Sequence, residues 1–107
     1  MIAEGVIAFR ELQISGDPPR QVSVAINQPF RNGDAWRCEF CIDGLNREKV
    51  DFYAMGADSM QALVLALQNI AAFLYTSEDF KSEHLSWLGQ RNLGFPTAKV
   101  IADLVPD

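Results

Sequence analysis

The sequence is poor in the residues that metal and redox sites require. It contains two cysteines, Cys38 and Cys41, and one histidine. A structural zinc site takes four Cys or His ligands, and a thioredoxin-type C-x-x-C pair opens a helix, whereas this pair lies in a strand-like stretch. Residues three apart on a strand point to opposite faces, so the two thiols should not meet. We therefore expect two free thiols in a reducing compartment, and no cofactor.

Positive charge is also scarce. The nine Lys and Arg residues are scattered from Arg10 to Lys99, and the net charge is −5. Nucleic acids and anionic membranes bind to clustered basic residues, so we expect neither as a partner. The chain has no apolar run of about 18 residues that could span a membrane, and its start, MIAEGVIAFRELQ, lacks the basic region of a signal peptide. These absences predict a cytoplasmic protein.

The residues that are present predict a single α+β domain covering residues 1–107. Four stretches carry β-forming residues that alternate with polar ones, namely residues 2–14, 21–28, 35–43 and 49–55. They are separated by SGDPPR, PFRNGD and GLNRE, in which Pro, Gly and Asn favour turns. Short turns between successive strands predict a four-stranded antiparallel meander.

The hydrophobic period then changes from two to 3.6, which predicts one long helix over residues 59–75, packed on one face of the sheet. We expect its sheet-facing side to consist of Met60, Leu63, Val64, Leu67, Ile70, Ala71 and Leu74. No charged residue occurs from Ser59 through Ser77, although a solvated helix side normally carries Lys and Glu. We therefore expect the second side to be partly covered, by the C-terminal residues or by another chain.

The pattern beyond this helix is weaker. Residues 77–84 are polar and could form a second short helix with Ser77 as its cap. Residues 84–96 contain large apolar side chains but also two glycines and a proline, which indicates an ordered loop. Residues 97–105 fit either a short helix or an edge strand, and their helical spacing favours the helix.

The stretch GADSM at residues 56–60 resembles the attachment site of carrier proteins, where a serine at the start of a helix bears phosphopantetheine. A helix N-terminus suits a phosphate because its N–H groups are free. However, carrier proteins are helical bundles, and their helix after the serine is rich in acids. We favour the simpler interpretation, in which Asp58 caps the helix, Gln61 completes a capping box and Ser59 has no chemical role.

Other catalytic interpretations have less support. A serine nucleophile needs a base, and the only imidazole, that of His84, is far along the chain from Ser59. We expect Glu78, Asp79 and Glu83 to form a solvated acidic turn rather than a metal site. The sequence identifies no catalytic, cofactor-binding or metal residue, and it favours a protein without catalytic activity while leaving an enzyme open.

Three motifs together resemble a family of small stand-alone bacterial proteins of unknown function. They are W-x-C-x-F-x-I-x-G at residues 36–44, G-x-D-S-x-Q-A-L-x-L-A-L at residues 56–67, and L-x-W-L-G with L-G-F-P at residues 85–89 and 93–96. The resemblance implies a domain of four strands and a helix. It implies no activity, cofactor or catalytic residue.

The charge-free helix and the aromatic C-terminal loop favour a cytoplasmic protein that binds another protein, either a second copy in a homodimer or a different chain. The predicted interaction surface is Leu65, Gln68, Asn69, Ala72, Trp87 and Phe95. An immunity-type protein that neutralises a bacterial toxin is one alternative. Another is a small-molecule binder or weak enzyme, with a pocket lined by Trp87, Phe95 and Tyr53 between the helix and the loop. A carrier with phosphopantetheine on Ser59 is the minor alternative.

Overall fold

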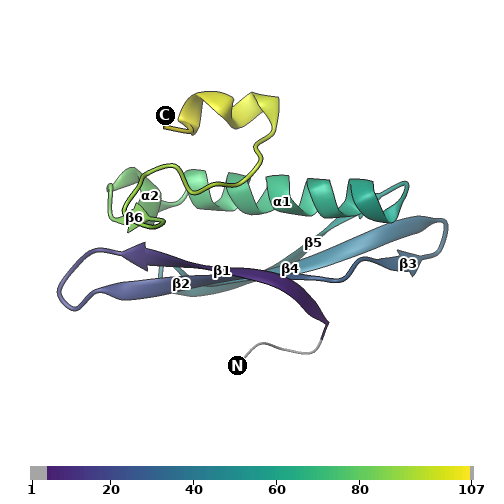
Figure 1. Cartoon of the computed structure of the whole chain (residues 1–107), viewed down its shortest axis with the longest axis horizontal. Coiled ribbons are helices and arrows are strands. Elements are labelled where there is room, and N and C mark those ends of the chain that lie inside the picture. Colours follow the sequence, from purple (N-terminus) through teal and green to yellow (C-terminus); the bar gives the residue numbers. More distant parts are fainter. Residues whose placement is uncertain (1–4, 107) are drawn as a thin grey trace.

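The computed structural model describes residues 5–106, which form an antiparallel sheet with a long helix on one face (Figure 1). The strands are β1 (Val6–Ile14), β2 (Arg20–Asn27), β3 (Phe30–Asn32), β4 (Ala35–Leu45), β5 (Glu48–Gly56) and β6 (Leu85–Ser86). Helix α1 (Ser59–Tyr75) follows β5, and it is followed by the short helix α2 (Glu78–Lys81) and the 3₁₀ helix η1 (Lys99–Leu104). The α+β prediction is confirmed.

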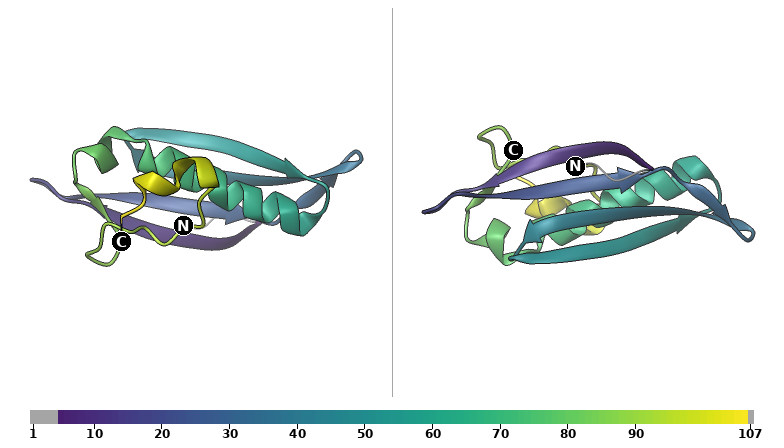
Figure 2. Two further views of the ribbon diagram at one scale, coloured as in Figure 1. Left: turned by 90° about the horizontal axis from the view of Figure 1, so that it is seen from above. Right: turned by 90° about the horizontal axis from the view of Figure 1, so that it is seen from below.

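The predicted number of four strands is wrong, because two short strands extend the sheet to six. β1, β2, β4 and β5 pair antiparallel in that order, β3 pairs with the start of β4, and β6 pairs with the end of β1. β3 has three residues and β6 has two, which is too short for an alternating pattern to reveal them. Because of this strand order, β1 and β5 lie at the two long edges of the sheet (Figure 2).

A tight turn joins β4 to β5, and the end of β5 leads into α1. Asn46 and Arg47 both have positive φ, at 53° and 62°, as a two-residue type I′ turn requires. The strand that follows ends at Gly56, where the chain reverses into α1. A Cβ at Gly56 would clash with the backbone nitrogen of Ala62, so only glycine allows the helix to approach β5 this closely.

Asp58 occupies the N-cap of α1. Its carboxylate accepts a hydrogen bond from the Gln61 backbone N–H at 2.7 Å, and the Gln61 side chain accepts one from the Ala57 N–H at 2.6 Å. Both acceptors satisfy backbone donors that the start of a helix leaves without partners. Ser59 is exposed in the first turn, and β5 rather than a helix precedes it.

The bounds of α1 match the prediction, but the predicted sheet-facing side is wrong in part. Met60 and Val64 were expected against the sheet, yet they are 73% and 42% exposed. Ala62 and Ala66 are fully buried instead. Their small side chains let the helix axis come close to β4 and β5, where α1 makes nearly all of its sheet contacts. Ranking helix positions by hydrophobicity favours the larger Met and Val side chains, and it therefore misses Ala62 and Ala66 as sheet-facing positions.

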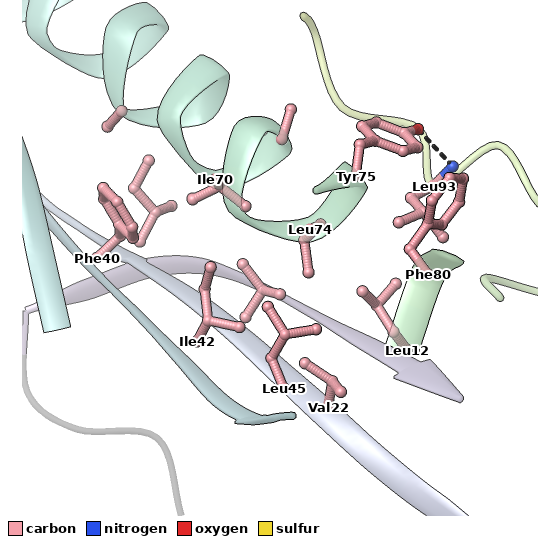
Figure 3. Packing of buried hydrophobic residues seen from close by; sticks show 14 of the residues in the cluster. Leu12, Val22, Phe40, Ile42, Leu45, Ile70, Leu74, Tyr75, Phe80 and Leu93 are labelled. Carbon is pink, nitrogen blue, oxygen red and sulfur yellow. Dashed lines mark hydrogen bonds between the residues drawn. The ribbon is translucent and has the colours of Figure 1, made fainter. Parts of the chain in front are cut away.

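The core lies between α1, the inner face of the sheet and Leu93 from the C-terminal part of the chain (Figure 3). Its wholly buried members include Leu12, Val22, Ile42, Ile70, Leu74, Leu85 and Leu93. Each such side chain contributes about 1.5–3 kcal/mol when it is removed from water. Phe40, Phe52 and Phe73 add edge-to-face ring contacts under the β5 side of α1.

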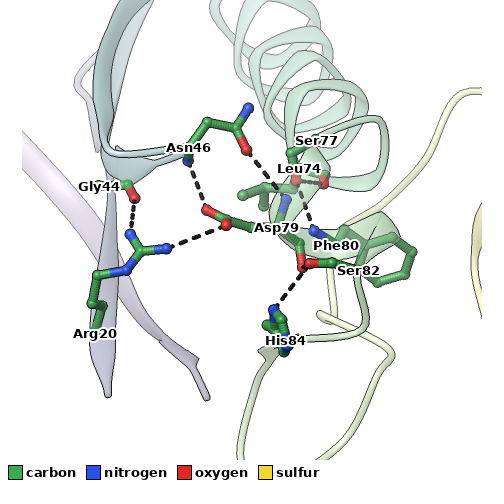
Figure 4. Close-up of polar contacts among 9 residues, drawn as sticks. All are labelled: Arg20, Gly44, Asn46, Leu74, Ser77, Asp79, Phe80, Ser82 and His84. Carbon is green, nitrogen blue, oxygen red and sulfur yellow. Dashed lines mark hydrogen bonds and ion pairs between the residues drawn. The ribbon is translucent and has the colours of Figure 1, made fainter. Parts of the chain in front are cut away.

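A polar clamp holds one end of the molecule together (Figure 4). Arg20 pairs with Asp79 at 3.3 Å, and Asp79 accepts a hydrogen bond from the Asn46 N–H at 2.7 Å. The Asn46 side-chain oxygen in turn accepts a hydrogen bond from the Asp79 backbone N–H at 3.2 Å. The expectation of a solvated acidic turn is therefore wrong for Asp79, which joins α2 to β2 and to the β4–β5 turn.

Removing the cap of α1 should cost more than removing the serine beside it. We expect Asp58→Ala to lower the free energy of unfolding by about 1 kcal/mol, because the Gln61 N–H loses its acceptor. Ser59→Ala should have a much smaller effect, since its hydroxyl is exposed and makes no hydrogen bond among residues 5–106. Urea denaturation of both variants tests this, and a larger loss for Ser59→Ala would contradict the assignment of the cap.

Candidate interaction surface

The side of α1 that faces away from the sheet is covered in part by the chain itself. Residues 87–106, called the C-terminal segment below, cross over the helix (Figures 1 and 2). Tyr75 is 1% exposed although its side chain points away from the sheet, toward Leu93 (Figure 3). The Tyr75 hydroxyl accepts a hydrogen bond from the Leu93 N–H at 2.9 Å, and burial raises the pKa of Tyr75. The sequence left open whether the C-terminal residues or another chain cover this side of α1. In the structure it is the C-terminal residues that do so.

Arg10 of β1 holds the same segment from the side of the sheet. Its guanidinium donates to the Leu93 and Gly94 carbonyls at 3.0 and 3.2 Å. The guanidinium carbon lies 3.8 Å from the centre of the Trp87 ring and 4.9 Å from that of Phe95, so both rings stack on the cation. Burial lowers the pKa of Arg10. No pattern in the sequence indicates this contact, since Arg10 is separated from its partners by some eighty positions.

The six residues of the predicted interaction surface do not form one exposed patch. Leu65, Gln68 and Ala72 are half-buried on α1. Asn69 instead turns toward the sheet, where its amide donates to the Tyr53 carbonyl of β5 at 3.5 Å. The remaining two, Trp87 and Phe95, hold Arg10. That any of these residues contacts a partner stays a prediction.

A cavity of about 220 Å³ opens beside the buried core, called the β1 groove below. Ala8 and Phe9 of β1, Ile26 of β2, Leu67 of α1 and Pro96 of the C-terminal segment contribute to its mostly apolar lining. It forms because α1 lies mainly over β4 and β5 and makes fewer contacts with β2. Of the three residues expected to line a pocket here, Phe95 does so, whereas Trp87 and Tyr53 do not.

The two long edges of the sheet differ in how the chain protects them. At β5, Asn69 satisfies the Tyr53 carbonyl, and charged Glu48, Lys49 and Asp51 discourage pairing with another strand. At β1, β6 pairs only with Gln13 and Ile14. Within the described part of the chain, residues 6–12 of β1 have no strand on the side away from β2; this side is called the β1 edge below.

Exposed apolar side chains accompany the β1 edge. Ile7 is 51% exposed and Phe9 is 55% exposed. A bulge interrupts the pairing with β2 between Val6 and Ala8, and beyond it Arg10 and Glu11 are the charged residues of this stretch. Bulges and charges are the usual protection of an edge strand, but Arg10 turns toward the C-terminal segment. The edge and the groove together form a continuous candidate interaction surface.

The residues considered for chemistry are not brought together. Ser59 begins α1, whereas His84 lies beyond the other end of the helix and contacts the Ser82 hydroxyl at 3.1 Å. Cys38 is buried on the inner face of the sheet and Cys41 is half-buried on the outer face, so the two free thiols point apart. Among residues 5–106, no three His, Cys, Asp or Glu side chains are placed to hold a metal ion.

The contact between Tyr75 and Leu93 should contribute measurably to stability. We expect Tyr75→Phe to lower the free energy of unfolding by about 1–3 kcal/mol, because it leaves the buried Leu93 N–H without an acceptor. Tyr53→Phe is the matched control, since the Tyr53 ring lies on Arg37 at the outer face of the sheet. Chemical denaturation should separate the two variants, and equal losses would show that the Tyr75 hydroxyl does not hold the segment.

Comparison with known proteins places the chain in a family by its sequence. None of the helices within residues 5–106 is long and apolar enough to cross a membrane. No curated protein and no solved structure matches the chain. The model of the domain of unknown function DUF6968 matches residues 8–97, which include β2–β6, both α-helices and most of β1. The chain therefore belongs to the DUF6968 family of domains of unknown function.

Proposed function

We propose that this protein acts in the cytoplasm by binding another polypeptide through the β1 edge and the adjoining β1 groove. The single observation that carries the proposal is the β1 edge, where residues 6–12 have no strand of the described chain on the side away from β2, next to an open apolar cavity. The two free cysteines fit a reducing compartment.

An open strand edge offers two kinds of contact at once. Its backbone N–H and C=O groups are ready to pair with an added strand, which supplies affinity without regard to sequence. Alternate side chains of that strand would point to the inner face of the sheet, where Ala8, Ile26 and Leu67 line the groove. The groove would therefore select strands that carry an apolar side chain at the matching position.

The β1 edge is a better candidate than the outer side of α1, which the sequence favoured. The C-terminal segment already contacts the buried Tyr75, and a partner on that side would have to displace the Leu93 hydrogen bond and the Arg10 contacts. At the β1 edge a partner would not have to displace any strand formed by residues 5–106. Immunity-type recognition of a toxin would be one form of such binding, and it stays a prediction.

Small-molecule binding is the second candidate, and the β1 groove is the observation that favours it. Its volume of about 220 Å³ is smaller than the roughly 300 Å³ at which ligand pockets usually begin. A groove of this size suits one side chain of a bound strand better than a whole ligand. The carrier alternative is not supported by the fold, because β5 precedes Ser59 where carriers have a helix.

A photoreactive aromatic residue can locate the interaction surface before the partner is identified. We expect p-benzoylphenylalanine at position 9 to form covalent adducts with a polypeptide in cell lysate, whereas the same residue at position 30 should not. Phe30 is the matched control, because it is a phenylalanine on a strand with 43% exposure, close to the 55% of Phe9.

A second substitution links the adducts to the edge itself. Ile7→Lys should abolish the position 9 adducts, because a lysine on an edge strand opposes pairing. Adducts of equal yield at positions 9 and 30, or position 9 adducts that persist with Ile7→Lys, would overturn the proposal. Adduct masses identify the captured chain.

A further inference from the structure

We propose that the strand bound at the β1 edge carries one carboxylate side chain, which pairs with Arg10, and one large aliphatic side chain, which enters the β1 groove. This inference rests on the proposed function, because it names the chemistry of the partner at the same surface. The partner strand would run antiparallel to β1. Its recognition pattern, in chain order, would be Asp or Glu, one further residue, and then Leu, Ile or Val.

Arg10 is a cation without an anionic partner in the described chain. Arg20 and Arg37 form ion pairs with carboxylates, whereas no carboxylate among residues 5–106 lies within ion-pair distance of the Arg10 guanidinium. Its hydrogen bonds go to backbone carbonyls instead. Burial lowers the pKa of Arg10, because the guanidinium loses water and gains no counter-charge. An incoming carboxylate would supply the charge that the chain itself does not provide.

The guanidinium also keeps hydrogen-bond donors free for a carboxylate. The bonds to Leu93 and Gly94 both come from Nη1, and the N–H groups of Nε and Nη2 have no acceptor within the described residues. None of these donors is sealed from solvent, since residues 5–106 contain no buried side-chain nitrogen without a partner. Trp87 covers a face of the guanidinium, which leaves the in-plane N–H groups accessible.

The rest of the groove favours an apolar side chain. Arg10 is the only charged residue among those that line it. Ala8 lies on the same face of β1, two positions before Arg10, and its small side chain leaves space next to Ile26 and Leu67. The volume of about 220 Å³ suits one aliphatic side chain. The cation and the apolar space therefore lie two strand positions apart.

The part of β1 that this contact uses is regular. The bulge lies between Val6 and Ala8, and from Ala8 onward each residue pairs with one residue of β2. Side chains of an added strand opposite Arg10 and Ala8 would share the inner face, whereas the one opposite Phe9 would face outward. β6 meets the end of the same edge antiparallel, and an antiparallel strand places the carboxylate before the aliphatic residue.

Charge elsewhere on the chain limits the pattern to a single acid. The net charge is −5, and Glu11 lies on the outer face of β1, where it accepts a hydrogen bond from the Ser23 hydroxyl. An acid opposite Phe9 would lie on the same outer face as Glu11, and the two like charges would repel each other. A partner with a run of acids would thus be opposed, whereas one inward carboxylate meets Arg10.

Strand peptides blocked at both ends test the pattern on the unmodified full-length chain by fluorescence anisotropy. We expect a peptide with Glu and Leu in the proposed order to bind at least about threefold more tightly than the same peptide with Gln in place of Glu, because the cross-strand ion pair is lost. Ala in place of Leu should weaken binding at least about fivefold, because the groove stays unfilled. A peptide with Glu and Leu exchanged is the control of equal composition and should also bind more weakly.

Substitutions of Arg10 test whether this residue selects the carboxylate. Arg10→Gln should abolish the preference for the Glu peptide over the Gln peptide, and Arg10→Lys, which retains the charge, should restore part of it. Arg91→Gln is the matched control and should keep the full preference, since Arg91 also donates to a backbone carbonyl and lies over a ring, both of Phe80. The readout is a ratio of two affinities, which a general loosening of the C-terminal segment would not change.

The outcomes separate this inference from the function on which it rests. Equal binding of the Glu and Gln peptides, or no peptide binding at millimolar concentration, would overturn the inference; the proposed function would stand if position 9 still captures polypeptides from lysate. A preference for Glu that persists with Arg10→Gln would also overturn the inference. Equal binding of the exchanged peptide would overturn the antiparallel arrangement. The absence of both peptide binding and position 9 adducts would overturn the proposed function as well.

Discussion

The structure depends on the burial of α1 from two sides. Ala62 and Ala66 press against β4 and β5, while Tyr75 lies under the C-terminal segment, where it contacts Leu93. Where both sides are covered, the helix has little solvated surface on which charges could be placed at low cost, whereas Met60 and Val64 nearer its start stay exposed. The Tyr75 hydroxyl supplies the polar contact that this burial needs, because it satisfies the Leu93 N–H inside the apolar layer.

The position of α1 has a consequence at the opposite edge of the sheet. The helix lies over β4 and β5, so the inner face of β1 and β2 must be covered by something else. The C-terminal segment covers it at one end, where Arg10 holds Leu93 and Gly94, and the rest stays open as the β1 groove. The open edge of β1 adjoins this gap, which is why an interaction is proposed there rather than on the helix.

The sequence predicted the α+β class, the bounds of α1 and its cap, because alternation, helical period and Asp58 are local signals. It could not reveal β3 and β6, which are too short to have a pattern. Nor could it separate Met60 from Ala62 as the sheet-facing residue, since close packing favours small side chains where hydrophobicity scales favour large ones. Arg10 and the β1 groove result from contacts across some eighty positions, which a single sequence does not encode in any local pattern.

Residue-resolved hydrogen exchange across a range of protein concentrations tests most directly that the chain covers α1 itself and leaves the β1 edge open. We expect the Leu93 amide, bonded to the Tyr75 hydroxyl, to be protected even at high dilution, when only single copies are present. We also expect the outward amides of residues 6–12 to exchange rapidly at the same dilution, because no strand of the described chain pairs with them. Protection of Leu93 that develops only at high concentration would contradict this picture, because α1 would then be covered by a second copy.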